Sequence, residues 1–411
     1  MNVQEMARQV KEASFALGAT PLELRNRALK AIADALKDHK EDIFAANARD
    51  LSAGAMLPAP ILGRLSFDDH KLRDVTEGIS GLISLPDPAG KILFKRELDE
   101  GLILTKVSCP IGVIGVIFES RPDALVQISS LCVKSGNGAI LKGGSEAKET
   151  NRTLFSVIYE AGVRAGLPEH FASLIEDRAA IEELLGCSDS VDLLIPRGSN
   201  AFVRHIMEHS DIPVMGHASG LCHIYVDKNA DPDMAIPLII DAKTQYVSAC
   251  NAAETLLLHK DIADVVLERL KHASGQHVDY IPAQSEEDFR EYLDYKMTTK
   301  IVNDEDEAIA HINRYGSHHT DCIITEDEAA AERFQTLVDS AGVYWNASTR
   351  FADGFRYGFG AEVGISTGKL PPRGPVGLDG LVTYKYRLKG NGQIVGDYAS
   401  GKKAFHFVDL A

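Results

Sequence analysis

The sequence predicts an α/β protein with two doubly wound domains, each built on a parallel sheet, and a small β-hairpin near the C-terminus. Three observations support this fold class. Short β-branched runs alternate with helical stretches from about residue 107, which is the pattern of βαβ units. A second series of the same kind begins near residue 232. The length of 411 residues agrees, because roughly 150 residues per domain allow two to three domains.

The first half of the chain is predicted to begin with helices and to continue as alternating strands and helices. Residues 20–37 open with Thr20, Pro21 and Glu23, a capping box with proline at the first helical position, and apolar residues follow at helical spacing. We expect strands at 112–118, 139–142, 191–195 and 224–226, and helices at 146–165 and 200–209.

The second half is predicted to form a domain with its own sheet. We expect helices at 232–243, 262–272 and 327–339, and strands at 254–258 and near 300, 322 and 343. A strand at 381–388 and the segment 393–395 flank Gly390, Asn391 and Gly392, which predicts a terminal β-hairpin. Because such a hairpin has little core of its own, we expect it to complete the sheet of a partner chain.

Composition and charge narrow the range of functions. Hydrophobic residues make up 45% and charged residues 25% of the chain, which is typical of folded soluble proteins. The 43 basic and 59 acidic side chains give a net charge of −16. Such a chain is repelled by nucleic-acid phosphates and by anionic membranes, so we expect a small-molecule substrate and neither a nucleic-acid nor a membrane partner.

Cysteine spacing and the N-terminus indicate a reducing compartment. The six cysteines form no CxxC pair, which argues against a zinc site and a disulfide framework. The first twenty residues contain no apolar targeting core, and the most apolar stretch, 107–118, is too short to cross a bilayer. We therefore expect a cytoplasmic location.

Two glycine-bearing turns, 143–145 and 197–200, each join a predicted strand to a helix. Such a turn presents backbone N–H groups and the positive end of a helix to a pyrophosphate. Neither turn has a GxGxxG or phosphate-binding-loop pattern, so a purely conformational role of the glycines stays open.

Cys250 is the candidate nucleophile. It lies among small polar residues between a predicted helix and a predicted strand, where a thiolate is accessible. The alternative is a buried inert thiol, which is common for free cysteines. The fourteen histidines show no metal-ligand spacing, so no metal site is expected. A Cys–His pairing stays open, because such partners are adjacent only in the fold.

Glu119, Ser120 and Arg121 follow an apolar strand at its carboxyl end. Ligands of open α/β sheets bind at that edge, so these side chains are candidates for recognising a polar substrate. A helix cap with solvated charges is the alternative.

Several motifs in a fixed order resemble the γ-glutamyl phosphate reductase family of the aldehyde dehydrogenase superfamily. They include PIGVIGVIFESRP (110–122), AILKGGSEA (139–147), DAKTQYVSACNAAETLLLH (241–259) and the stretch from NASTRF to RGPVGL (346–378). The resemblance runs from about residue 10 to 388. It implies an aldehyde dehydrogenase-like fold and a homo-oligomer, a dimer or higher. The implied domains are a cofactor-binding domain (1–230) interrupted by flap strands near 95–108, a catalytic domain (231–360), and a return segment with a C-terminal oligomerisation hairpin (361–411).

The resemblance also implies a reaction. It is the NADPH-dependent reduction of L-glutamyl 5-phosphate to L-glutamate 5-semialdehyde and phosphate, the second step of proline biosynthesis from glutamate, through a thioester on Cys250. The implied cofactor-binding residues are Lys142, Gly143, Ser145, Gly198 and Ser199. Many NAD-preferring relatives have glutamate in place of Ser145, and serine leaves room for a 2′-phosphate.

Departures from the wider superfamily refine these roles. The stretch 216–220 has no carboxylate where hydrolytic relatives have a glutamate base, which favours a purely reductive enzyme. The superfamily's catalytic asparagine falls at or near Ser120, so oxyanion stabilisation is expected from backbone N–H groups at Cys250, with Asn251. Val247 stands where the family has proline, so the rigidity of the backbone beside Cys250 stays an open question, whereas the chemistry is unaffected. The substrate's anionic groups should bind Arg121, Arg350 and Arg373, and its ammonium Glu119.

Two rival functions stay open. One is a related reductase of another acyl phosphate or of an acyl-CoA, and the other is a non-catalytic nucleotide-binding assembly protein. Retention of Cys250 and Asn251 favours an enzyme. Because no kinase domain is fused to the chain, the acyl phosphate is expected from a separate glutamate kinase, with a transient contact between the two proteins left open.

Overall fold

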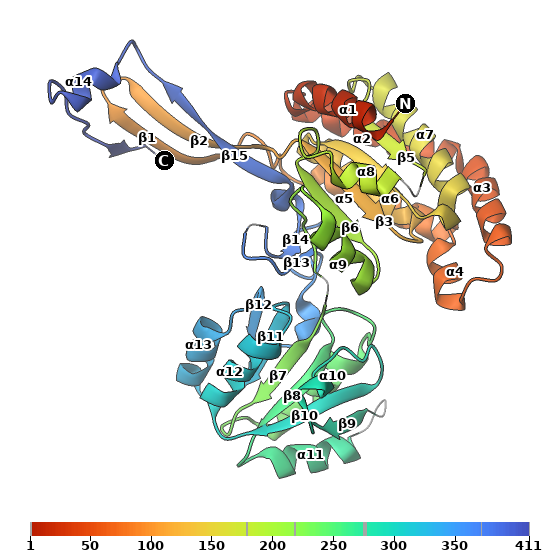
Figure 1. Ribbon diagram of the computed structural model, residues 1–411, viewed down its shortest axis with the longest axis vertical. Helices are drawn as coiled ribbons and strands as arrows, with labels where there is room; N and C mark the ends of the chain where they lie inside the picture. Colours follow the sequence, from red (N-terminus) through yellow and green to blue (C-terminus); the bar gives the residue numbers. More distant parts are fainter. Residues whose placement is uncertain (1, 178–179, 218, 274–277, 371, 411) are drawn as a thin grey trace. The chain divides into compact units, whose positions relative to one another are not determined.

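The computed structural model describes residues 2–177, 180–217, 219–273, 278–370 and 372–410. It divides into two compact units (Figure 1). The first unit comprises Met1–Gly198, His205–Val214 and Gly377–Ala411, and the second comprises Ser199–Arg204 and Met215–Val376.

Helices dominate the first part of the first unit, as the sequence predicts. They are α1 (Val3–Gly18), α2 (Leu22–Asp38), α3 (Lys40–Ala53), α4 (Ala59–Leu65) and α5 (Asp69–Ser84). The predicted capping box at the start of α2 does not form. Pro21 takes the N-cap position without a side-chain cap, and the Thr20 hydroxyl donates to the carbonyl oxygen of Ala16, at the end of the preceding helix.

A four-stranded parallel sheet forms the centre of the first unit, in the order β5-β4-β3-β6. Its strands are β3 (Val113–Phe118), β4 (Gly138–Lys142), β5 (Ala172–Ile175) and β6 (Leu193–Arg197). The accompanying helices are α6 (Pro122–Ser135), η1 (Ser145–Ala147), α7 (Lys148–Arg164), α8 (Ala180–Leu185) and α9 (Asn200–His209). The chain proceeds from β3 to β4 and β5 on one side and adds β6 on the other. The switch point of this sheet, where ligands bind in such folds, therefore lies between the carboxyl ends of β3 and β6.

The second unit contains a six-stranded parallel sheet in the order β12-β11-β7-β8-β10-β9. Its strands are β7 (Cys222–Val226), β8 (Ala253–His259), β9 (Asp279–Pro282), β10 (Lys296–Val302), β11 (Thr320–Ile324) and β12 (Gly342–Trp345). The sequence grouped the strand at 224–226 with the first series. The structure corrects this, because β7 pairs with β8 and β11, so the second unit begins before residue 230.

Helices cover both faces of this second sheet (Figure 1). On one face α10 (Pro232–Thr244) and α11 (Ala263–His272) pack against Ile224 and Leu256. On the other face α12 (Glu305–Tyr315) and α13 (Glu328–Leu337) pack against Tyr225 and Leu257. Neighbouring residues of one strand thus enter opposite cores, as a strand buried on both faces requires.

A four-stranded antiparallel sheet, which we call the flap, projects from the first unit (Figure 1). Its order is β15-β2-β1-β16, with β1 (Ile92–Asp99), β2 (Leu102–Pro110), β15 (Val382–Lys389) and β16 (Val408–Asp409). The expected strands near 95–108 are β1 and β2.

The predicted C-terminal hairpin does not form. Strand β15 pairs with β2, from Val382 opposite Pro110 to Lys389 opposite Ile103. The Gln393 side chain accepts from the Asn391 N–H and donates to the Glu100 carbonyl, and α14 (Val395–Ala399) follows directly. The segment after the glycine turn therefore forms a turn and a helix. Further along the chain, the short strand β16 pairs with β1.

Candidate active site

The candidate nucleophile Cys250 lies in the turn between α10 and β8 of the second unit. The turn is closed by two backbone hydrogen bonds, from Ala249 to Tyr246 and from Ala252 to Ala249. Cys250 is partly exposed, whereas Cys132, Cys187, Cys222 and Cys322 are buried. Cys109, on β2 of the flap, is the other partly exposed cysteine within the described residues.

Burial separates Cys250 from the inert thiols. It raises the pKa of Cys132 and of Cys322 to about 12, and it raises the pKa of Cys222 as well. A thiol with so high a pKa is not a nucleophile at neutral pH, because the thiolate is the reactive form. Cys250 is thus the accessible thiol of the second unit.

Three contacts fix the backbone around Cys250. The Asn251 side-chain amide donates to the carbonyl oxygen of Ala352 at 2.8 Å, and the Thr349 hydroxyl donates to the carbonyl oxygen of Asn251 at 2.7 Å. The Cys222 thiol donates to the Cys250 carbonyl oxygen at 3.4 Å. Asn251 is buried, and the hydrogen bond from its side chain to Ala352 gives it a positioning role that the sequence did not predict.

Two histidines lie beside Cys250. One potential ligand atom from each of His217, Cys250 and His319 lies within 4.8 Å of the other two. The His217 and His319 rings meet edge to face with their centroids 5.2 Å apart. Burial, followed by His217 and Arg350, lowers the pKa of His319 to about 3, so its imidazole is neutral. The Cys–His proximity that the sequence left open is present.

Sheet topology explains why these three residues meet. His217 precedes β7, Cys250 precedes β8 and His319 precedes β11, and these three strands are neighbours in the parallel sheet. Segments that enter neighbouring parallel strands meet at one edge of the sheet. The spacing of these residues along the chain does not encode such a meeting.

Arg350 brings a cation to the same edge. It lies on η3 (Thr349–Phe351) and is buried, its Nε donates to Gln245 Oε1 at 2.9 Å, and its guanidinium lies 5.9 Å from the Tyr246 ring centroid. Burial lowers the pKa of Arg350, and the charge of Cys250 acts in the opposite direction. A partly desolvated guanidinium is suited to a carboxylate or a phosphate.

Arg373, the other arginine predicted in this unit, has a protein partner. Its Nη2 donates to the carbonyl oxygen and to Oδ1 of Asp339, both at 3.2 Å. Lys369 forms an ion pair with the same carboxylate. A substrate anion at Arg373 must therefore compete with Asp339.

Glu119, Ser120 and Arg121 lie in the first unit, between β3 and α6, at the switch point of its sheet. The Glu119 N–H donates to the Arg197 carbonyl oxygen at 3.0 Å, which joins the ends of β3 and β6. Ser120 has a φ of +45°, which L residues rarely adopt. Its N–H and hydroxyl donate to Glu146 Oε1 at 2.7 and 2.6 Å, and these two bonds hold the strained conformation.

Three of the predicted cofactor residues, Lys142, Gly143 and Ser145, lie at the turn after β4. Lys142 is buried and its ammonium donates to the Gly143 carbonyl oxygen, whereas Ser145 is exposed. A Cβ atom on Gly143 would lie 2.1 Å from Asn151 Nδ2, so the turn requires glycine at this position. The exposed Ser145 side chain is accessible to a nucleotide at this turn. Gly198 and Ser199 are exposed after β6, Gly198 in the first unit and Ser199 in the second.

Comparisons with known proteins show the family of the chain. A family model described as the aldehyde dehydrogenase family matches residues 1–286. The γ-glutamyl phosphate reductase of Acetivibrio thermocellus is 57% identical and that of Pelotomaculum thermopropionicum is 58% identical, and each alignment covers 98% of this chain and 97% of the relative. The chain belongs to the γ-glutamyl phosphate reductase family. The predicted family and the enzyme class, an aldehyde dehydrogenase-type oxidoreductase, are confirmed, and membership implies a nicotinamide cofactor.

Solved structures confirm the predicted fold. The γ-glutamyl phosphate reductase of Thermotoga maritima is 36% identical, with a TM-score of 0.91 over 95% of this chain and 99% of that one. An acetylating aldehyde dehydrogenase from Geobacillus thermoglucosidasius is 17% identical with a TM-score of 0.67, and so shares the fold. Among the described residues of this reductase-family chain, no helix has the length and apolarity needed to cross a bilayer. Ala218, in the stretch 216–220 without a carboxylate, and Pro371, in the stretch 346–378, lie outside the described residues.

Proposed function

We propose that this chain reduces L-glutamyl 5-phosphate to L-glutamate 5-semialdehyde and phosphate with NADPH, and that Cys250 is the nucleophile. The observation that carries the proposal is the accessible Cys250 thiol on a braced turn, with His217 and Arg350 beside it. The substrate follows from the names of relatives that are 57 and 58% identical over nearly the whole chain.

In the first step Cys250 attacks the γ-carbonyl carbon. A C–S bond forms, the bond from carbon to the phosphate oxygen breaks, and phosphate leaves with little need for an acid. His217 is the base that we assign to the thiol proton, because its imidazole lies beside the sulfur. While His217 holds this proton it cannot take one from water, so the thioester is protected from hydrolysis.

When bound, the nicotinamide cofactor supplies the hydride that reduces the thioester carbon. The residues of this chain then stabilise the oxyanion and release the product. The Cys250 backbone N–H is the oxyanion donor that we expect, and Asn251 supports it by holding the 349–352 segment. Expulsion of the sulfur gives the aldehyde, and Cys250 takes back its proton from His217.

Substrate recognition is assigned first to Arg350. Arg350 is the cation beside the nucleophile and is the residue we expect to bind a substrate anion. Arg121 and Arg373 remain predicted contacts for the second anion, and Glu119 for the ammonium. Ser120 remains a predicted catalytic residue, although its hydroxyl donates to Glu146 in this structure.

The preference for NADPH rests on Ser145. Its side chain is exposed at the turn after β4, where a glutamate would repel a 2′-phosphate. Lys142, Gly143, Gly198 and Ser199 complete the proposed cofactor site. A cytoplasmic location and a transient contact with a glutamate kinase remain predictions from the sequence.

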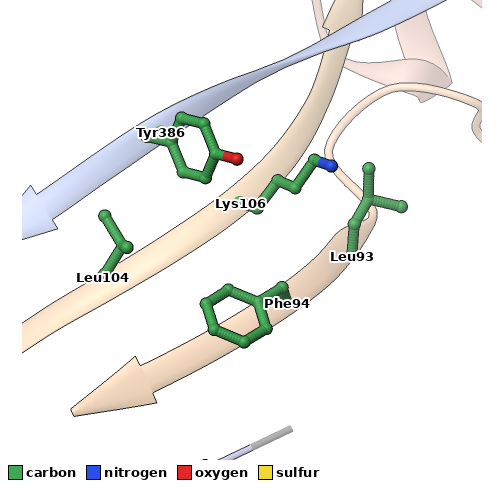
Figure 2. Close-up of a pocket in the computed structure, with 5 residues that line it drawn as sticks. All are labelled: Leu93, Phe94, Leu104, Lys106 and Tyr386. Atoms are coloured by element: carbon green, nitrogen blue, oxygen red, sulfur yellow. The ribbon is translucent and has the colours of Figure 1, made fainter. Parts of the chain in front are cut away.

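The flap is the surface that we assign to homo-oligomer formation. An apolar groove on it is lined by side chains of β1, β2 and β15 (Figure 2), namely Leu93, Phe94, Leu104, Lys106 and Tyr386. Tyr384, Tyr386 and Leu388 of β15 are 49, 58 and 59% exposed. Aromatic and aliphatic side chains at this density are typical of a surface that another subunit covers. Leu93→Glu with Tyr386→Glu should lower the mass measured by light scattering.

The decisive assay is phosphate-dependent reduction of NADP⁺ by glutamate semialdehyde. Cys250→Ala should lower kcat at least about 10³-fold, because loss of a catalytic nucleophile removes the covalent route. Cys109→Ala, at the other partly exposed cysteine, should leave kcat unchanged. Phosphate-dependent turnover by Cys250→Ala would contradict the covalent scheme.

The same assay separates the rival functions. Wild-type activity with acetyl-CoA or aspartyl phosphate, and none with the glutamyl substrate, would favour a related reductase. A folded oligomer without turnover on any of these substrates would favour a non-catalytic nucleotide-binding protein.

A further inference from the structure

The cluster of Cys250, His217 and His319 offers a second kind of chemistry. A thiolate and imidazole nitrogens are the ligands that Zn²⁺ and related divalent transition metals prefer. We propose that these three residues form a site for such a metal, and that the bound metal blocks the nucleophile and inhibits the enzyme. The inhibition rests on the proposed function of Cys250, whereas the binding does not.

His217 is held in the tautomer that a metal ligand needs. Its Nδ1 lies 3.0 Å from the carbonyl oxygen of Ile365. A carbonyl only accepts, so Nδ1 carries the hydrogen and the lone pair is on Nε2. A hydrogen bond from the second ring nitrogen to a carbonyl is the usual support of a metal-bound histidine.

His319 supplies the independent observation. It is 1% exposed, and its Nδ1 lies 2.9 Å from the Thr320 hydroxyl. Its Nε2 is buried and, within the described part of the chain, has no hydrogen-bond partner. An unsatisfied buried polar atom is unusual in a folded protein, and a metal ion would satisfy it.

The spacing of the three atoms suits a tetrahedral site after a small movement. Zn–S and Zn–N bonds of about 2.3 and 2.0 Å place ligand atoms roughly 3.5 Å apart. The Cys250 sulfur and one ring nitrogen of each histidine lie within 4.8 Å of one another, so side-chain movements of about 1 Å suffice. Three protein ligands leave the fourth position open to water or to an anion.

Arg350 lowers the affinity that we expect of this site for a metal cation. Its guanidinium, on the same edge of the sheet, disfavours a second cation. We therefore expect reversible binding, weaker than at closed structural zinc sites, and competition by phosphate, which can bind Arg350 and the open metal position. The buried Cys222 thiol, whose hydrogen bond is to the Cys250 backbone, is not a ligand.

The test uses Co²⁺ as a spectroscopic probe of the full-length, chelator-treated protein. The wild type should bind one Co²⁺ per chain and develop the near-ultraviolet charge-transfer absorption of a cobalt thiolate. Cys250→Ser should abolish that absorption, and Cys109→Ser should preserve it. His319→Gln should weaken binding at least about tenfold. If this buried substitution impairs folding, judged by circular dichroism, His217→Gln carries the same expectation at a partly exposed position.

Two results would overturn the site: no charge-transfer absorption in the wild type, or an undiminished absorption in Cys250→Ser. Zn²⁺ should displace Co²⁺ and inhibit turnover, and a chelator should restore it; turnover with bound Zn²⁺ would refute the inhibition. Because cobalt binding is measured without substrate, the two proposals fail separately. An active enzyme without the absorption refutes only the metal site, and an inactive protein with it refutes only the proposed reaction.

Discussion

Gly220 packs directly against the backbone of Cys250. A Cβ atom on residue 220 would lie 2.1 Å from the Cys250 carbonyl oxygen and 2.6 Å from its Cα. No side chain fits at these distances. The segment before β7 can therefore pack against the turn that holds Cys250 only because residue 220 is glycine. In the sequence, the stretch 216–220 is informative only for its lack of a carboxylate, and the structure shows what Gly220 contacts.

Gly220→Ala should therefore displace Cys250. We expect kcat to fall about 100-fold, because a shift of about 1 Å at a reacting group has that effect. The measurement is steady-state turnover together with the melting temperature. Gly78→Ala is the matched control, since nothing lies within 4 Å of a Cβ at that helical position. An unchanged kcat in Gly220→Ala would show that the turn adapts.

Thiol labelling should distinguish the cysteines. We expect iodoacetamide to modify Cys250 first, because it is partly exposed and the neighbouring Arg350 stabilises a thiolate. Cys109 should react more slowly. The buried cysteines should react only on unfolding, and these are Cys132, Cys187, Cys222 and Cys322. Peptide mass spectrometry of the folded protein measures this order, and equal labelling of Cys132 and Cys250 would contradict it.

Ser145→Glu should change the cofactor preference. A carboxylate at this exposed position repels the 2′-phosphate of NADPH and accepts hydrogen bonds from the ribose hydroxyls of NADH. We expect KM for NADPH to rise at least about tenfold relative to KM for NADH. Ser156→Glu, on the exposed surface of α7, is the control for added charge. Equal changes in KM for NADPH in Ser145→Glu and Ser156→Glu would contradict a 2′-phosphate site at Ser145.

His311 should make the second unit sensitive to acid. The residue is 3% exposed, and burial, followed by His223 and Lys300, lowers its pKa to about 3, while Glu307 opposes this shift. The unfolded chain protonates this histidine near its ordinary pKa of about 6.5. The neutral ring therefore contributes stability that is complete above about pH 6.5 and is lost as the pH falls towards about 3.

The variant His311→Gln tests this dependence. Below about pH 6.5 each such histidine adds a slope of about 1.4 kcal/mol per pH unit to the free energy of unfolding. We expect the slope to decrease by that amount in His311→Gln and to stay unchanged in His272→Gln, an exposed histidine of α11. The fluorescence of Trp345, the single tryptophan, reports unfolding of this unit. Equal slopes in the wild type and His311→Gln would refute the assignment.

Much of the fold follows from local pattern. Strand β3 is a continuous apolar run and helix α11 is amphipathic, so the positions of such elements are visible in the sequence. Two of the wrong predictions concerned segments whose structure depends on which strand they pair with. Strand β7 was predicted to belong to the first domain, but it pairs with β8. Gln393 was predicted to lie in a hairpin strand, but its side chain contacts Glu100. The local sequence of a segment does not show which neighbour the segment contacts.

Motifs and periodicity along the chain were sufficient for the family and the α/β architecture, and they predicted Cys250 as the nucleophile. The side chains that surround Cys250 became visible in the folded structure alone. His217, His319 and Arg350 come from distant segments, and they meet because β7, β8 and β11 are neighbours in one parallel sheet and η3 contacts the nucleophile turn through Asn251. Strand order is a property of the folded sheet, and spacing along the chain does not encode it.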